Sequence, residues 1–375
     1  MTGTLSALII ILMPLGAMAE PLRIATYDAG LRRDGPGLLL RDITLAEDQA
    51  TAAIAMIAAL KADILLLTGM DQDQQGASLR ALAEALAARG VHYPHLLPLA
   101  GNRGVETGLD LDGDGRSGGP GDAQGWGRFT GAGGMALLSR YPVDPAGLID
   151  MSTLLWRNLP GAEMPRKDGQ AFPSDAAQAV QRLSSSGHYA IPVRTPQGRI
   201  TLLAFAATPP VFDGPEDANG LRNADEIRLW DALLGGALDL PPPPAPRVLL
   251  GNANLDPHDG EGRRQVIADL LAGPLWQDTG PAAPTPVAED PSHVGPAAQD
   301  TAFWRPQAEG GPGGLRVDYV LPERGITVVN SGVLVDVTGA TGSGATGAGP
   351  GADVAARAST HRPVWIEIEL PPPLR

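Results

Sequence analysis

The sequence predicts a layered α/β fold, in which two packed β-sheets carry helices on their outer sides. Residues 22–27 alternate between apolar and polar side chains, as a strand does. Residues 47–62 then place apolar side chains at helical spacing, and residues 64–67 form a continuous apolar run typical of a buried strand. The order strand, helix, buried strand, helix is that of a layered α/β domain.

The remaining elements follow from the same patterns. A second helix places Leu79, Leu82 and Leu86 on one face, and a long loop rich in Gly and Asp then spans residues 101–134. A loop of this length inside a compact domain is usually functional or disordered. A tract rich in Gly, Ala and Thr at 338–351 predicts a surface loop. We expect further strands at 135–142, 189–193, 199–206, 248–250, 316–321, 326–329 and 364–370, and helices at 223–234 and 263–271.

Composition and charge narrow the classes of function. The 375 residues can form one large core, and 42 acidic against 28 basic residues give a formal net charge of −14. A field of that sign repels polyphosphates, so we do not expect nucleic acid as a tight partner. The absence of cysteine excludes disulfides and thiolate metal sites. We expect a monomer; the sequence names no partner.

The N-terminus predicts export. An apolar stretch at residues 5–16 is followed by Ala17-Met18-Ala19, a small-x-small cleavage pattern. We therefore expect a signal peptide at residues 1–19 and a mature domain at residues 20–375, located in the periplasm or secreted. Because no Lys or Arg precedes the stretch, an N-terminal anchor or a misassigned start are the alternatives, although the stretch is too short to span a bilayer comfortably.

Seven segments carry distinctive motifs, and they are Ile24 to Asp28, Leu65 to Asp71, Gly134 to Pro142, Leu203 to Pro210, Leu249 to Pro257, Arg316 to Leu321 and Ser359 to Val364. Together they resemble the motifs of the endonuclease/exonuclease/phosphatase (deoxyribonuclease I-like) superfamily, in its exported bacterial subgroup. The resemblance covers essentially the whole mature chain. It implies an α/β (α+β) fold, a four-layer αββα sandwich of two mostly antiparallel sheets packed face to face with helices outside. It also implies phosphodiesterase or phosphatase chemistry that depends on Mg²⁺.

The same resemblance shows what this chain lacks. The superfamily's metal-ligand Glu falls on Gly69, the Asp of its Gly-Asp-x-Asn motif on Asn252, and the Asp of its Ser-Asp-His motif on Thr360. Its first catalytic His falls on Ala206, and Asp28 stands where an Asn is expected. The catalytic remnants are Asn254, Asp318 and His361.

These substitutions bear directly on the chemistry. Phosphodiester hydrolysis needs a hard cation held by carboxylates to offset the charge of the transition state, together with a base for the attacking water. Three carboxylates and one imidazole are missing, so the first hypothesis is a pseudoenzyme whose cleft binds or scaffolds. The second is an active metal-dependent enzyme rebuilt around Asp28, Asn254, Asp318 and His361, although the lost ligand charge makes Mg²⁺ doubtful here.

The surviving polar residues have structural explanations beside the functional ones. Asn254 is alternatively a residue that closes the turn after a strand. His361 with Asp318 is either a buried pair kept for packing, which we favour, or a working general base. Asp28 is either a compensating metal ligand or a turn-capping residue, and we favour the cap.

The long loop carries a separate pattern. Asp110, Asp112 and Asp114 follow Asp-x-Asp-x-Asp-Gly spacing, as in the first half of an EF-hand loop. The acid that should close such a loop is absent, and Asp122 comes one place late. The third hypothesis is therefore an extracytoplasmic interaction protein stabilised by Ca²⁺ bound here, against the alternative of a solvated acidic loop. Another charge-dense segment, at residues 213–228, is expected to cap helices and form surface ion pairs.

Overall fold

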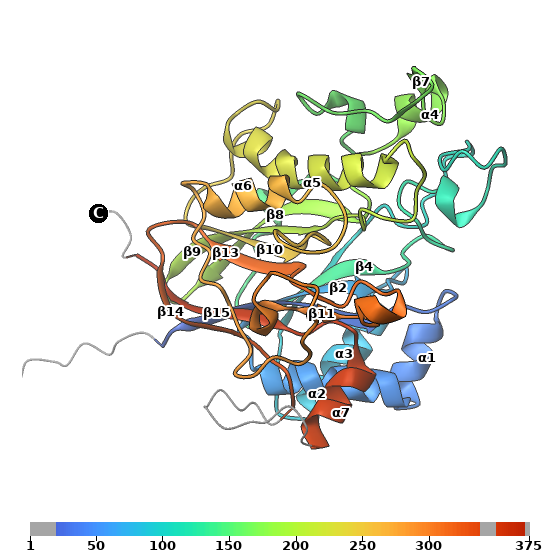
Figure 1. The fold of residues 1–375 in the computed structure, drawn as a ribbon. Helices are drawn as coiled ribbons and strands as arrows, with labels where there is room; N and C mark the ends of the chain where they lie inside the picture. The colour runs from blue at the N-terminus through green and yellow to red at the C-terminus, as the bar shows by residue number, and fades with distance from the viewer. Residues whose placement is uncertain (1–19, 338–349, 372–375) are drawn as a thin grey trace, which may run out of the picture.

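The computed structural model describes residues 20–337 and 350–371. The expected signal peptide and most of the tract at 338–351 lie outside the described residues. The described chain forms the predicted sandwich of two large sheets packed face to face, with helices on both outer sides (Figure 1).

The six-stranded sheet contains the first and the last strands of the chain. Its central pair, β1 and β2, is parallel, and the other neighbours are antiparallel. In spatial order the strands are β14 (Thr327–Val333), β15 (Val364–Glu369), β1 (Leu22–Leu31), β2 (Ile64–Met70), β4 (Gly134–Ser139) and β3 (His95–Leu99).

The five-stranded sheet has the same design, with one parallel pair, β9 and β10, among antiparallel neighbours. Both sheets are thus mixed but mostly antiparallel, as expected. The spatial order is β13 (Asp318–Pro322), β10 (Arg247–Asn252), β9 (Gly198–Ala206), β8 (Gly187–Thr195) and β5 (Ile149–Asp150). Two short hairpins lie outside these sheets, and they are β6 (Arg166–Lys167) with β7 (Gln170–Ala171), and β11 (Ala302–Phe303) with β12 (Gly314–Leu315).

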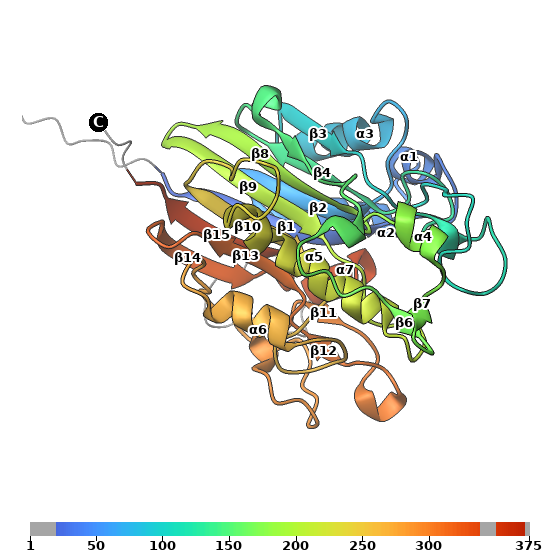
Figure 2. The same cartoon turned by 90° about the horizontal axis from the view of Figure 1, so that it is seen from above.

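Helices cover the outer face of each sheet, as the two perpendicular views show (Figures 1 and 2). The helices α5 (Ala218–Leu234) and α6 (Gln265–Ala272) pack on the five-stranded sheet. Those that pack together on the six-stranded sheet are α1 (Leu38–Thr44), α2 (Asp48–Leu60), α3 (Ala77–Ala87) and α7 (Pro350–Ala358). The short helix α4 (Asp175–Val180) lies in the connection before β8.

Alternation along the strands divides the core into layers. Ile24, Leu66 and Leu202 point between the sheets, where the strands of both sheets bury a shared apolar layer. Their neighbours Leu65 and Leu203 point outward and pack under the helices. Because successive strand side chains face opposite sides, one sequence pattern fills three core layers.

The sequence patterns did not predict the helices α1, α4 and α7, the strand β3, or the two-residue strands β5, β6, β7, β11 and β12. The strand β3 is short, contains a proline and fully buries only Leu99, so it lacks a strong apolar pattern. Helix α7 begins at Pro350, inside the tract that we expected to be a surface loop. The loop at 101–134 contains no strand and only one turn of 3₁₀ helix, Pro120–Asp122, as expected.

The expectation for the charged segment at 213–228 is correct only in part. Asp213 accepts the N–H of Asn219 in the first turn of α5, and Arg228 forms an ion pair with Asp225. Asp225 and Glu226 are fully buried, and Arg222 is nearly so. The Arg222 guanidinium donates to the carbonyls of Leu183, Gln124 and Arg182, while Glu226 accepts from the N–H groups of Ser185 and Thr208. The polar face of α5 therefore satisfies backbone groups of the surrounding loops, since buried backbone groups need partners.

No single helix in residues 20–337 and 350–371 is long and apolar enough to cross a membrane. The helices α1 and α2, which meet at 75°, reach that length and apolar character only when the two are counted together.

Candidate active site

The predicted site residues of the five-stranded sheet lie side by side where their strands end or begin, on the same side of the sheet. Asn252, the last residue of β10, pairs with Ala206 of β9 on one side and with Asp318 of β13 on the other. The residues that resemblance assigns to three separate motifs therefore form one row. The strand β1 packs against both β10 and β13, which brings Asp28 to this row.

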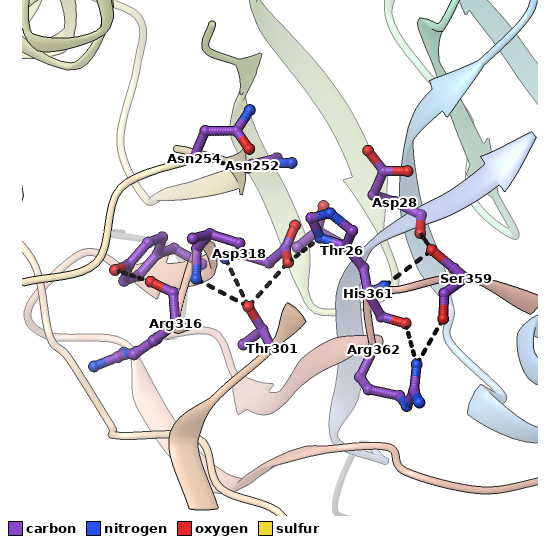
Figure 3. Close-up of polar contacts among 12 residues, drawn as sticks. Thr26, Asp28, Asn252, Asn254, Thr301, Arg316, Asp318, Ser359, His361 and Arg362 are labelled. Atoms are coloured by element: carbon purple, nitrogen blue, oxygen red, sulfur yellow. Dashed lines mark hydrogen bonds and ion pairs between the residues drawn. The ribbon is translucent and has the colours of Figure 1, made fainter. Parts of the chain in front are cut away.

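His361 and Asp318 form a short, buried hydrogen-bonded pair in the site. The Nδ1 atom of His361 lies 2.7 Å from Oδ2 of Asp318, which also accepts a 2.9 Å hydrogen bond from Thr301 (Figure 3). Both side chains are buried, and Oδ1 of Asp318 has no hydrogen-bond partner among the described residues. The ring of Trp304 packs edge-on against the imidazole, with centroids 5.7 Å apart.

Electrostatics favour a protonated imidazole in this pair. Burial lowers the pKa of His361, but the carboxylates of Asp318 and Asp28 outweigh it and raise the pKa above its usual 6.5. Burial also raises the pKa of Asp318. Both directions favour a proton on the pair, and a protonated imidazole suits a hydrogen-bond donor to an anion better than a general base.

Asp28 ends the regular part of β1 and is 2% exposed. Its carboxylate forms an ion pair with Arg32 and accepts the N–H of Gly30 at 3.1 Å. Its backbone carbonyl accepts from Ser359, whose hydroxyl also accepts the N–H of His361 (Figure 3). Burial raises the pKa of Asp28, but the cations Arg32 and His361 and the Gly30 N–H together lower it below its ordinary value.

Gly69 lies in β2, directly beside this ion pair. Its φ is +61°, a conformation that glycine adopts without strain. A Cβ atom at this position would lie closer than 3.0 Å to atoms of both Asp28 and Arg32. The position that resemblance assigns to the metal-ligand Glu is thus closed by an ion pair.

The other substituted positions also lack free ligands. The side-chain oxygen of Asn252 accepts the N–H of Asn254, and the amide of Asn254 donates to the carbonyl of Ala207 at 2.8 Å. Ala206 is buried in the layer between the sheets. Thr360 is exposed, and its carbonyl accepts from Phe303 in β11.

A second histidine lies on the strand next to Ala206, but it does not replace the catalytic histidine that is missing at that position. His188 of β8 is opposite Phe205, the residue before Ala206, and packs against Phe205 and Trp230 on the outer side of the sheet. Burial lowers its pKa to about 3, so it is neutral. It bonds to Ser184 and to the carbonyl of Glu226, and its role is structural.

A divalent cation does not fit the residues present at Asp28. Hard cations need several free oxygen ligands, most of them charged. Here Asp28 is neutralised by Arg32, Asn252 is engaged in a turn, and Asp318 is bound to His361 and Thr301. A metal would have to displace the Arg32 guanidinium before it reached the carboxylate of Asp28, which leaves Oδ1 of Asp318 as the carboxylate oxygen of this row that has no partner among the described residues.

The long loop does bring acidic groups together. Oxygens of Asp110, Asp112 and Asp122 lie within 4.8 Å of one another, and this is the one such group found among the described residues. Asp122 therefore takes the place that we expected for Asp114, whose carboxylate accepts the N–H of Arg116. Asp110 and Asp122 also accept backbone N–H groups of the loop.

Arg32 and Arg103 were missed by the sequence analysis. Arg32 reaches back four residues to Asp28, a spacing that helices use but that here depends on an irregularity in the strand between Asp28 and Leu31. Arg103 comes from the long loop and lies beside Arg32, near Gly133. The one signal visible in the sequence was the adjacent pair Arg32-Arg33, which follows shortly after Asp28.

The two sheets, their outer helices and the row of strand-end residues define the class as a deoxyribonuclease I-like α/β sandwich. The model of the Endonuclease/Exonuclease/phosphatase family matches residues 38–360. This match spans most of the sequence, and the chain belongs to that family.

Several solved structures resemble this chain, and the first of them supports the same fold. An endonuclease/exonuclease/phosphatase from Beutenbergia cavernae is 19% identical, with a TM-score of 0.51 over 94% of this chain and 72% of that one. Sphingomyelinase C from Streptomyces griseocarneus is 17% identical, with a TM-score of 0.48 over 92% and 99%. A mutant beta toxin from Staphylococcus aureus with bound magnesium ions is 12% identical, with a TM-score of 0.47 over 92% and 99%. A comparison with curated proteins finds no match.

Proposed function

We propose that this chain is an exported, catalytically impaired member of the family that binds phosphate esters without hydrolysing them. The observation that carries the proposal is the closure of the Gly69 position by the ion pair of Asp28 and Arg32. The guanidinium supplies the positive charge beside Asp28, but unlike a metal ion it cannot lower the pKa of a bound water to generate a nucleophile.

The surviving pair supports binding more than turnover. The raised pKa of His361 favours the protonated imidazole, which donates a hydrogen bond to an anion and has no free lone pair with which to accept the proton of water. The apolar segment at residues 5–16 and the following Ala-Met-Ala support export, and we propose that the protein acts as a monomer in the periplasm or after secretion.

Hydrolysis of bis(4-nitrophenyl) phosphate by the purified mature chain tests the proposal. We expect no turnover above the level of the His361→Ala variant in excess Mg²⁺ or Mn²⁺, and no change on adding a chelator. Turnover that requires the metal and disappears in His361→Ala would contradict the proposal. It would instead support the rebuilt site, in which Asp28 leaves Arg32 to hold a metal with Asn254, Asp318 and His361.

A second candidate function rests on the acidic loop. The approach of Asp110, Asp112 and Asp122 favours a Ca²⁺ site that stabilises the loop for interaction with another molecule. Burial and the three neighbouring carboxylates of the loop raise the pKa of Asp112, a repulsion that a bound cation would relieve.

We expect Ca²⁺ to raise the melting temperature of the purified chain relative to the same sample in chelator. A ligand that binds only the folded state stabilises it by about 2.7 kcal/mol at a free concentration roughly 100 times its Kd. The Asp112→Asn variant should lose this response, whereas Asp114→Asn, outside the three-carboxylate group, should retain it. An identical melting temperature with Ca²⁺ and with chelator would exclude the site.

A further inference from the structure

A cavity of about 280 Å³ adjoins the ion pair of Asp28 and Arg32. It lies between the segment after β1, the end of β2 and both ends of the long loop. Four of its lining side chains are arginines, an unusual concentration in a chain whose net charge is −14. The lining residues are Arg32, Arg33, Asp34, Asp71, Arg103, Trp126, Arg128, Ala132 and Gly133.

Three of the four arginines have carboxylate partners. Arg32 pairs with Asp28, Arg33 with Asp42 and Arg128 with Asp34. Arg128 and Asp34 are both largely exposed, and an exposed pair of this kind contributes little and exchanges readily with other ions.

Arg103 has no such partner. Its guanidinium makes no hydrogen bond or ion pair with any of the described residues, and its Nε is buried without a partner. It also lies beside Arg32, because a Cβ on Gly133 would be 3.1 Å from both side chains. Burial and the like charge of Arg32 lower the pKa of Arg103 to about 10, against the opposing effect of the carboxylates of Asp28, Asp71 and Glu226, none of which bonds to its guanidinium. A partly buried cation without a partner is costly, so a missing anion is the simplest explanation of its position.

The carboxylate of Asp71 does not serve as that anion. Its two oxygens accept the backbone N–H groups of Arg33 and Gly133, at 2.6 and 2.7 Å. Burial raises its pKa against the effect of these donors. Asp71 therefore holds the wall of the cavity in place and leaves the Arg103 donors open.

Trp126 adds an apolar surface to the same cavity. The side chain is 57% exposed, and the Arg128 guanidinium lies 6.0 Å from its ring centroid. An exposed indole beside arginines offers a face on which a planar group can stack while its anionic end meets the guanidinium groups.

We propose that this cavity binds a small organic phosphate monoester, with the phosphate on Arg103 and Arg32 and a planar group against Trp126. The planar fork of arginine matches tetrahedral oxyanions, and more than one fork can share a phosphate. The volume suits a ligand of mononucleotide size better than a polymer. The inference rests on the proposed function only in that the ligand is bound and not consumed.

Calorimetric titration of the purified chain in chelator tests this site, with inorganic phosphate, adenosine monophosphate and adenosine as probes. We expect phosphate to bind, adenosine monophosphate to bind about tenfold more tightly, and adenosine not to bind. Binding should weaken as salt is added, because charge dominates it. Absence of binding by both phosphate and the monophosphate would overturn the site.

Variants locate the binding. Arg103→Met should weaken both anionic probes by about tenfold or more, since charge-assisted hydrogen bonds are lost. Arg116→Met, the same change at an exposed arginine of the same loop, is the control and should bind as the parent chain does. Trp126→Ala should affect the monophosphate and leave phosphate unchanged. Equal binding by the parent and Arg103→Met would overturn the site, and equal effects of Trp126→Ala on both probes would overturn the stacking.

Stability supplies an independent readout. Without ligand, Arg103→Met should melt at the same temperature as the parent or higher, because it removes a cation that has no partner. A lower melting temperature would show that Arg103 has a structural role and would count against the proposal. If the monophosphate is bound and also hydrolysed, the binding site in the cavity is supported and the proposed absence of hydrolysis is wrong. A failure of one proposal can therefore be told from a failure of the other.

Discussion

Replacing Gly69 by alanine should destabilise the protein by about 3 kcal/mol, more than a positive φ alone explains. A left-handed conformation costs an ordinary residue about 1 to 2 kcal/mol, and overpacking a buried site adds about 1 to 3 kcal/mol. The new methyl group would force apart Asp28 and Arg32, which meet Gly69 closer than 3.0 Å on addition of a Cβ. Chemical denaturation at neutral pH measures the change in free energy of unfolding.

Gly90→Ala is the matched control. Gly90 also has a positive φ, +81°, but a Cβ there meets nothing within 4 Å. Its cost should therefore stay near that of the backbone conformation alone. If the two variants lose equal stability, the ion pair does not fill the Gly69 position, and the main support for catalytic impairment is removed.

The second large effect concerns His361. Removing this side chain by His361→Ala should cost roughly 3–5 kcal/mol, because breaking a buried pair leaves an uncompensated charge. Asp318 is fully buried, and its remaining partner is the hydroxyl of Thr301. The exposed His92 serves as the control, and His92→Ala should leave the free energy of unfolding unchanged.

The same pair predicts a pH dependence. The folded-state pKa of His361 is raised above 6.5, so its contribution to stability is complete below pH 6.5 and is lost as the pH rises through the folded-state pKa. We expect the unfolding free energy of the parent chain to fall over that window, and the fall to be absent in His361→Ala. A proton NMR titration of the imidazole gives the folded-state pKa directly, and a value below 6.5 would refute this prediction.

The fold followed from the sequence to a large extent because its signals are local. The apolar run at 64–67 and the alternation at 199–206 each reflect one strand and the layers on its two faces. The motif row was also within reach, since Ala206 ends a predicted strand, Asn252 follows another by two residues, and Asp318 lies within a third.

The arginines were out of reach for a physical reason. Arg103 meets Arg32 because the loop at 101–134 folds back over the end of β1, and neither composition nor periodicity records the path of a loop. The buried face of α5 was misjudged likewise. Arg222 and Glu226 are charged, and only the carbonyl and N–H groups of loops distant in sequence make their burial favourable.

Arg222 donates to the carbonyl of Gln124 in the long loop and to that of Arg182 outside it. These bonds hold one part of the loop in place, so that the two parts of the loop should differ in their susceptibility to proteases. Residues 112–120 are exposed throughout, whereas residues 122–125 are buried under α5. Trypsin should therefore cut after Arg116 without releasing a fragment, and the nicked protein should keep both of its halves associated. The arginine-lined cavity should survive in the nicked form, because Arg103 lies before the cut and Trp126 after it, and neither belongs to the exposed stretch at 112–120.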